Sequence, residues 1–289
     1  MRYIFFGTPE FAAKVLGKLI DAHVPPKAIV CNPDRPYGRR GIITPPPTKI
    51  AVEKSGEKID ILQPEKIDDK FLNVLQGYGA DFYVVCAYSK ILPADLVAIP
   101  RLGVVGVHPS VLPKLRGPSP IQSSILEGFT ETGVTLYILD NKVDHGEMIA
   151  GARIDISETD TYESLSFKIA NLAGDLLVKS FPEFTNGAIV AKPQDEAEAT
   201  YTKKFTTDEG YVDSKDLQKA ISGGDSNTAL PILRKIRALN PDPGVFTIVH
   251  GKRIKLLAAS IIDGRLELKV IQFEGKKPML FSGYQKPLF

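Results

Sequence analysis

The chain has few of the residues that carry metal or redox functions. It contains no tryptophan, two cysteines and four histidines in 289 residues. Cys31 and Cys86 lie in apolar runs that are typical of strands, so neither a disulfide framework nor a cysteine-based metal site is expected. His23 and His250 have no ligand-like spacing to the other histidines. We therefore expect no metal.

Long apolar segments are also missing. No run approaches the roughly 20 residues that a helix needs to span a bilayer. Residues 1–6 lead straight into a glycine turn and lack the length and cleavage site of a signal peptide. We expect a cytoplasmic, monomeric protein with no membrane partner.

The charge is close to balanced over the whole chain but not along it. The net charge is +2, which says little about partners. Residues 203–289 hold 15 lysines and arginines against nine acidic residues, whereas the rest holds 21 against 25. A basic C-terminal third fits a polyanionic partner such as RNA, and it equally fits a merely soluble basic domain.

The first two thirds of the sequence alternate apolar runs with helical spacing. Apolar residues recur at helical intervals within residues 11–19 and 159–183. Unbroken apolar runs predict buried strands at residues 3–6, 28–31, 81–87, 103–107 and 133–139. We expect an α/β domain with a doubly wound, mostly parallel, Rossmann-like sheet.

A second domain is expected after a linker. The predicted boundaries are residues 1–189 for the first domain, 190–206 for the linker and 207–289 for the second domain. Helical patterns at 215–221 and 227–239 precede apolar strand patterns at 245–249, 253–262 and 266–273, which glycine-containing turns separate. This succession is typical of a small OB-like β-barrel.

Residues 32–47 are rich in proline, glycine and arginine. That composition predicts an exposed loop with no packed element. Arg35, Arg39 and Arg40 are candidate phosphate contacts, and a simply solvated loop is the other interpretation.

His108 and Asp144 are the candidate catalytic residues. His108 follows the strand predicted at 103–107, at the carboxyl end where open α/β sheets place their sites. Asp144 follows the strand predicted at 133–139, so we expect its loop to face the same crevice. A carboxylate can orient an imidazole and support its cation, which makes the pair able to handle protons. From spacing alone a structural role for His108 stays open, and His145 is the competing histidine.

Motifs around these residues resemble the methionyl-tRNA formyltransferase family. In that family's order they are Gly7-Thr8-Pro9-Glu10-Phe11-Ala12, Pro33-Asp34-Arg35-Pro36, Ala87-Tyr88 with Ile91-Leu92-Pro93, His108-Pro109-Ser110 with Arg116-Gly117, and Asp144 with Gly146-Glu147-Met148. The resemblance continues through residues 236–244 and 274–279, and so covers nearly the whole chain. The His-Pro-Ser and Asp-x-Gly elements alone are shared with glycinamide ribonucleotide and sugar-nucleotide formyltransferases.

The resemblance implies a reaction. A formyl group would pass from 10-formyltetrahydrofolate to the α-amine of methionyl initiator tRNA, for translation initiation, with His108 and Asp144 as catalytic residues and no metal. Arg35, Arg39 and Arg40 would contact the tRNA, together with an OB-like tRNA-binding domain. The folate would lie against Tyr88, Ile91, Leu92, Ser110, Val111, Leu112, Pro113 and Val143. A sugar-nucleotide N-formyltransferase is the alternative.

Gly106 departs from the family, whose members carry asparagine two residues before the histidine. The asparagine amide can donate to the developing oxyanion, and loss of one such donor costs on the order of 10²–10³ in rate. Water, another side chain or nothing could take its place. Three interpretations stay open. The chain is an active formyltransferase that is slower or stabilises the oxyanion differently, a folate- and tRNA-binding homologue impaired in turnover, or a protein with an artificial substitution at residue 106. If only that donor is missing, Gly106→Asn is expected to raise the rate.

Overall fold

The computed structural model describes residues 1–38, 41–223 and 226–283. The chain divides into two compact units. The large unit comprises Met1–Gly117, Thr132–Ile154 and Ser166–Tyr201. The small unit comprises Pro118–Glu131, Asp155–Leu165 and the chain from Thr202 onward.

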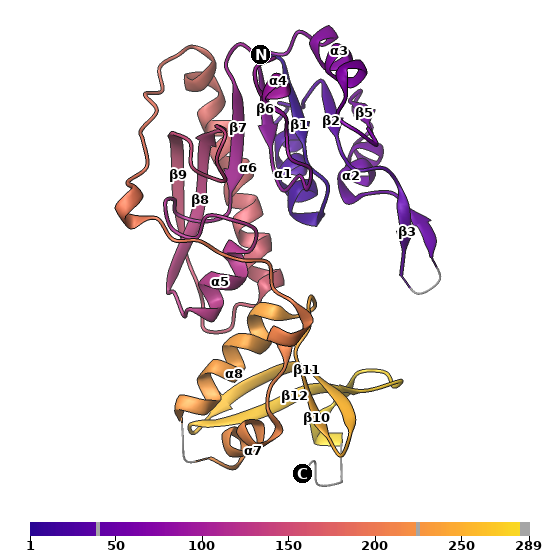
Figure 1. The fold of residues 1–289 in the computed structure, drawn as a ribbon, viewed down its shortest axis with the longest axis vertical. Helices are drawn as coiled ribbons and strands as arrows, with labels where there is room; N and C mark the ends of the chain where they lie inside the picture. Colours follow the sequence, from indigo (N-terminus) through magenta and orange to yellow (C-terminus); the bar gives the residue numbers. More distant parts are fainter. Residues whose placement is uncertain (39–40, 224–225, 284–289) are drawn as a thin grey trace. The chain divides into compact units, whose positions relative to one another are not determined.

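Seven strands form the sheet of the large unit, in the order β5-β2-β1-β6-β7-β8-β9 (Figure 1). They are β1 (Tyr3–Phe6), β2 (Ala28–Val30), β5 (Asp60–Leu62), β6 (Phe82–Val85), β7 (Val104–His108), β8 (Glu131–Ile138) and β9 (Met148–Asp155). The pairs β1–β2, β2–β5, β1–β6 and β6–β7 are parallel. The predicted doubly wound, mostly parallel sheet is confirmed.

Helices pack on both faces of this sheet because successive side chains of a strand point to opposite sides. Ile4 and Phe6 of β1 belong to a core cluster with residues of α3 (Asp69–Gly77) and α4 (Ala94–Val97). Tyr3, on the other face, has its ring 5.1 Å from that of Phe181 in α6 (Tyr162–Thr185). The helices α1 (Glu10–Asp21) and α2 (Pro47–Ser55) complete the large unit.

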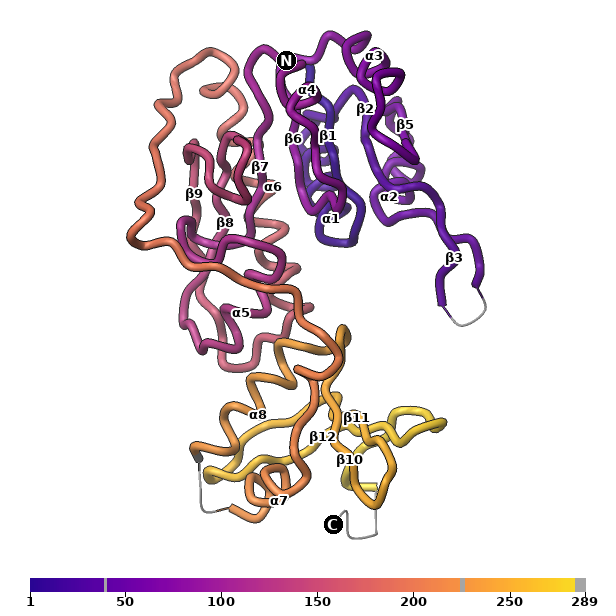
Figure 2. Tube along the Cα trace, viewed as in Figure 1, coloured from indigo at the N-terminus to yellow at the C-terminus, as the bar shows by residue number. Residues whose placement is uncertain are grey.

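Two expectations from the sequence were wrong in detail. The run at 133–139 was grouped with the parallel strands, but β8 pairs antiparallel with β7. Residues 32–47 were expected to contain no packed element, yet β3 (Arg35–Tyr37) and β4 (Ile42–Thr44) pair as a hairpin that stands out from the sheet (Figure 2). The side chains of β3 are all exposed, so no apolar alternation could reveal it.

The small unit is built on a second, antiparallel sheet. Its strands are β10 (Phe246–Val249), β11 (Lys252–Ile262), β12 (Arg265–Phe273) and β13 (Met279–Leu280), in that order. Three helices accompany the sheet: α5 (Pro120–Leu126), α7 (Ser214–Ser222) and α8 (Ser226–Leu239). Arg237 of α8 donates to the main-chain oxygens of Asp160 and Ser157, which ties residues 155–165 to this unit.

No helix in the described parts of the chain is both long and apolar enough to cross a membrane.

Candidate active site

His108 is the last residue of β7 and is only 4% exposed. Its Nε2 lies 2.8 Å from the main-chain oxygen of Leu115. A carbonyl oxygen can only accept, so Nε2 carries a proton and donates it. When the ring is neutral, Nδ1 therefore holds the lone pair and is the atom that can take up a proton.

The strand before Asp144 runs in the direction opposite to the one expected from the sequence. A shared sheet edge was expected, but in the antiparallel pair His108 lies opposite Thr135, and Ile138 lies opposite Val105. The loop after β8 thus starts about 10 Å from His108, at roughly 3.3 Å for each of three residues, and must turn back. The antiparallel pairing makes the shared-edge argument wrong, although the loop does bring Asp144 to His108.

Gly146 allows that return. A Cβ built on Gly146 would lie 1.7 Å from the main-chain oxygen of Ile138, a distance that no side chain can occupy. The Ile138 N–H donates to the oxygen of Glu147 over 2.9 Å, which closes the loop. The glycine of the Asp-x-Gly motif is thus required by a close backbone approach.

The Asp144 carboxylate is held by two donors and faces the histidine. Its Oδ1 accepts from the Tyr137 hydroxyl at 2.6 Å, and its Oδ2 accepts from the Gly117 N–H at 2.7 Å. Oδ2 also lies 3.5 Å from His108 Nδ1. Asp144 adopts a left-handed φ of 48° and Gly117 a φ of 108°. The positive φ is ordinary for glycine but strained for Asp144, and such strain persists where the surroundings fix it and clusters at functional sites.

Burial and charge act in opposite directions on His108. Burial lowers the pKa of His108 below its ordinary value, while the negative charge of Asp144 raises it by a smaller amount. The imidazole is therefore neutral near pH 7, and a proton that reaches Nδ1 would lie between the ring and Oδ2. Burial also raises the pKa of Tyr137, which keeps its hydroxyl protonated and able to donate.

The space beside Gly106 is occupied. Gly106 lies opposite Tyr137 in the β7–β8 pair. A Cβ built on Gly106 would lie 2.4 Å from Cε1 and 2.5 Å from Cζ of the Tyr137 ring. The side chain that stands where the family's asparagine would extend is therefore a tyrosine of the neighbouring strand.

Two residues that sequence reasoning did not assign to the site support the Asp144 loop. Gln194 Nε2 donates to the main-chain oxygens of Asp144 and Gly146, both at 2.9 Å. Its Oε1 accepts from the Arg116 guanidinium, which is completely buried and also pairs with Glu196. Arg116 belongs to the motif that begins at His108, whereas Gln194 lies in a polar segment with no periodicity. No pattern in the sequence could have identified Gln194.

The predicted folate contacts fall into buried and exposed groups. Ser110 is 1% exposed and its hydroxyl donates to the Lys114 oxygen. Leu112 is also buried, and its N–H donates to the Thr135 hydroxyl. Ile91 and Val143 are exposed apolar side chains, at 94% and 67%. The other four, Tyr88, Leu92, Val111 and Pro113, are half-buried, and Tyr88 and Leu92 pack on the core cluster of β1 and β6.

Of the predicted tRNA contacts, the structure describes Arg35, which lies on β3. The guanidinium of Arg35 forms an ion pair with Glu65, and both side chains are largely exposed. Arg39 and Arg40 lie outside the described residues. At the base of the hairpin, Lys49 pairs with Asp34 over 2.8 Å.

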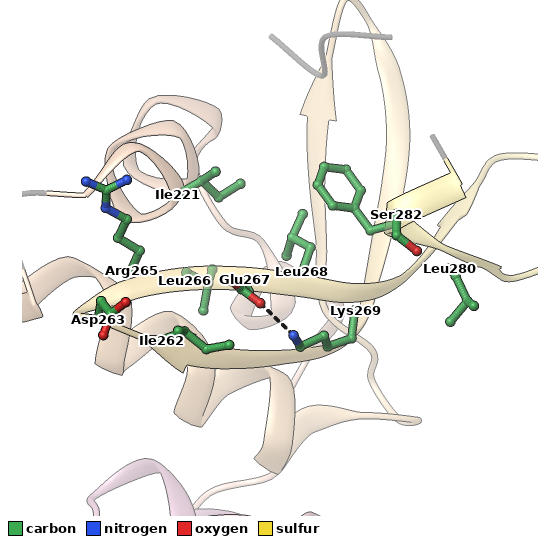
Figure 3. A pocket seen from close by; sticks show the side chains of 11 residues that line it. Ile221, Ile262, Asp263, Arg265, Leu266, Glu267, Leu268, Lys269, Leu280 and Ser282 are labelled. Atoms are coloured by element: carbon green, nitrogen blue, oxygen red, sulfur yellow. Dashed lines mark hydrogen bonds and ion pairs between the residues drawn. The ribbon is translucent and has the colours of Figure 1, made fainter. Parts of the chain in front are cut away.

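A cavity of about 830 Å³ lies in the small unit, far in the sequence from the predicted catalytic residues (Figure 3). Its lining mixes aliphatic with polar and charged side chains, and the labelled Lys269 and Glu267 pair with each other. Across residues 1–38, 41–223 and 226–283, no three His, Cys, Asp or Glu side chains are grouped so that they could hold a metal ion.

Known families and relatives match most of the chain in sequence. A family model described as formyl transferase matches residues 1–181, and one described as formyl transferase, C-terminal domain, matches residues 226–265. The methionyl-tRNA formyltransferase of Halorhodospira halophila is 38% identical over 266 residues, which cover 92% of this chain and 82% of that protein.

Solved structures share the fold. The methionyl-tRNA formyltransferase from Clostridium thermocellum superposes with a TM-score of 0.59 at 17% identity, covering 94% of this chain and 98% of that one. HypX from Aquifex aeolicus, in complex with tetrahydrofolic acid, superposes with a TM-score of 0.64 at 15% identity, covering 97% of this chain and 46% of that one.

Proposed function

Because the chain belongs to the formyl transferase family, we propose that it transfers a formyl group from 10-formyltetrahydrofolate to the α-amine of methionyl initiator tRNA. The observation that carries this proposal is the pairing of His108 Nδ1 with Asp144 Oδ2 at 3.5 Å. The relative from Halorhodospira halophila, named for that substrate, supports the choice of acceptor.

The reaction needs one proton to leave and another to arrive. The amine attacks the formyl carbon, a new N–C bond forms, and the bond from that carbon to the folate nitrogen breaks. The amine must lose a proton and the folate nitrogen must gain one. His108 Nδ1 accepts the first proton while Asp144 stabilises the resulting imidazolium, and the pair returns a proton to the leaving nitrogen. Asp144, whose side chain is 16% exposed, is the outward member of the pair.

We propose that the folate lies against the exposed apolar side chains of Ile91 and Val143. Each belongs to a loop that follows a strand of the large unit. Both side chains are apolar and exposed, so each can bury apolar surface against a bound folate. Ser110 and Leu112 are buried and contribute indirectly, because their hydrogen bonds to Lys114 and Thr135 fix the loop after β7.

We propose that the tRNA is held by backbone phosphate contacts. Arg35 is available because an exposed ion pair such as Arg35–Glu65 contributes only about 0–1 kcal/mol, which a phosphate can replace. In the small unit, Lys252 and Lys255 begin β11, and Lys276 and Lys277 follow the end of β12, which pairs with that part of β11. All four are exposed and form a basic end of this sheet.

The test is formyl transfer by the purified chain from 10-formyltetrahydrofolate to charged initiator tRNA. Asp144→Asn should lower kcat by on the order of 10³, as expected for a group that acts together with its histidine. Asp140→Asn, in the same loop, is the matched control and should keep most of the activity. No transfer by the parent chain would overturn the proposal, and transfer to an amino-sugar nucleotide instead would favour the alternative.

A further inference from the structure

We propose that Tyr137 is a positioning residue for this reaction, that it occupies the space left by Gly106, and that the two positions are coupled. The inference rests on the proposed function. Tyr137 belongs to none of the motifs on which the family resemblance was based.

The first argument is steric. Residues directly opposite each other on antiparallel strands have Cβ atoms only about 4.5–5.5 Å apart. Gly106 and Tyr137 are such a pair. The Tyr137 ring passes within 2.5 Å of the place where a Cβ at residue 106 would lie, and this tyrosine is only 6% exposed. The ring can take this position because residue 106 has no side chain.

The second argument concerns the single hydrogen of the phenol. A tyrosine hydroxyl has one hydrogen to donate. Tyr137 donates it to Asp144 Oδ1 over 2.6 Å. This leaves Oδ2 for the Gly117 N–H and for His108 Nδ1. Tyr137 therefore acts through Asp144, whose orientation it sets, and does not substitute for the asparagine as an oxyanion donor.

This arrangement reverses the expectation for Gly106→Asn. An asparagine Cβ at residue 106 would force the rigid ring of Tyr137 to turn away, and the bond to Asp144 would break. Leu139 Cδ1, 2.7 Å from the same Cβ position, is the end of a flexible side chain and can move. Gly106→Asn alone should therefore lower the rate, whereas Gly106→Asn combined with Tyr137→Leu has room for the carboxamide.

The experiment compares the parent with Tyr137→Phe, Gly106→Asn, Tyr137→Leu and the Gly106→Asn/Tyr137→Leu double variant. Tyr137→Phe keeps the ring and should lower kcat about tenfold with little change in KM, since one hydrogen bond to a charged group is lost. The kcat of the double variant should exceed that of Gly106→Asn at least tenfold, which would be a strong departure from additivity. Tyr83→Phe is the matched control, because the buried Tyr83 hydroxyl has no hydrogen-bond partner among the residues that the structure describes.

A second measurement does not depend on activity. In an NMR titration of the His108 ring, Tyr137→Phe should raise the His108 pKa, because the charge on Asp144 Oδ2 is less compensated when the phenol is gone. An unchanged His108 titration, an unchanged kcat for Tyr137→Phe, or a double variant no better than Gly106→Asn would each overturn the proposal. An inactive parent whose His108 responds as expected would instead refute the proposed function and leave intact the link from Tyr137 through Asp144 to His108.

Discussion

Gln194 Nε2 donates to the main-chain oxygen of Asp144 over 2.9 Å, although 50 residues separate the two in sequence. The same amide accepts from Arg116, so the buried guanidinium, the Gln194 amide and the Asp144 loop form one connected network. Gln194 lies within residues 190–206, which were expected to be a linker. Its hydrogen bonds show that this residue also supports the Asp144 loop.

Gln194→Ala should loosen the Asp144 loop. It removes two donors to main-chain oxygens and leaves Arg116 without one of its acceptors. At about 1 kcal/mol for each typical hydrogen bond, we expect a stability loss of about 2–3 kcal/mol. We also expect a drop in kcat, which denaturant unfolding and the formyl-transfer assay would measure together. Gln76→Ala, at an exposed helical position, is the control and should change neither.

Gly146→Ala should displace Asp144 without changing any charge. The added methyl group would meet the Ile138 oxygen at 1.7 Å, so the loop must move. A shift of about 1 Å at a catalytic group can cost on the order of 100-fold in rate. Gly151→Ala is the control, since a Cβ there would lie 3.8 Å from the Val134 oxygen, an ordinary van der Waals distance. Equal activity for the two variants would show that the return of the loop does not depend on this contact.

Much of the fold could be predicted from the sequence, because buried strands and amphipathic helices leave periodic patterns. The strand at residues 3–6 and the helix at 227–239 agree with β1 and α8 to within a residue. The short strand β5 and the exposed hairpin strand β3 leave no such pattern, since their side chains are exposed or half-buried.

The site was harder to predict. His108 and Asp144 could be named from motifs, but the direction of β8 depends on tertiary pairing that local spacing does not encode. Tyr137 looked like one more apolar residue of a buried run. Its role depends on which residue lies opposite it, and that is a property of the register alone.

The buried His108 should make the stability of the protein depend on pH near neutrality. Burial lowers the pKa of His108 in the folded state, so the unfolded chain binds this proton first as the pH falls. This contribution to stability is fully present above the unfolded value of about 6.5 and is lost as the pH falls below it. The slope should reach at most about 1.4 kcal/mol per pH unit for one proton.

Unfolding by urea at several pH values between about 5 and 8 would measure this slope, a range centred on the ordinary histidine pKa. His108→Asn should flatten the dependence, whereas the exposed His23→Asn should leave it as in the parent. If His108→Asn keeps the full slope, another group is responsible for it.

Arg35→Ala should weaken tRNA binding in a manner that depends on salt. A phosphate contact releases condensed counterions, so loss of one contact should reduce the slope of log K against log salt concentration by about 0.7–0.9. The stability of the free enzyme should change little, because the exposed Arg35–Glu65 pair contributes only about 0–1 kcal/mol to it. Arg101→Ala removes an equal charge from an exposed position outside the hairpin and is the control. Identical salt slopes for the two variants would mean that Arg35 contributes only to the overall charge of the protein and makes no phosphate contact. The tRNA backbone would then have to be held by the basic end of the sheet in the small unit.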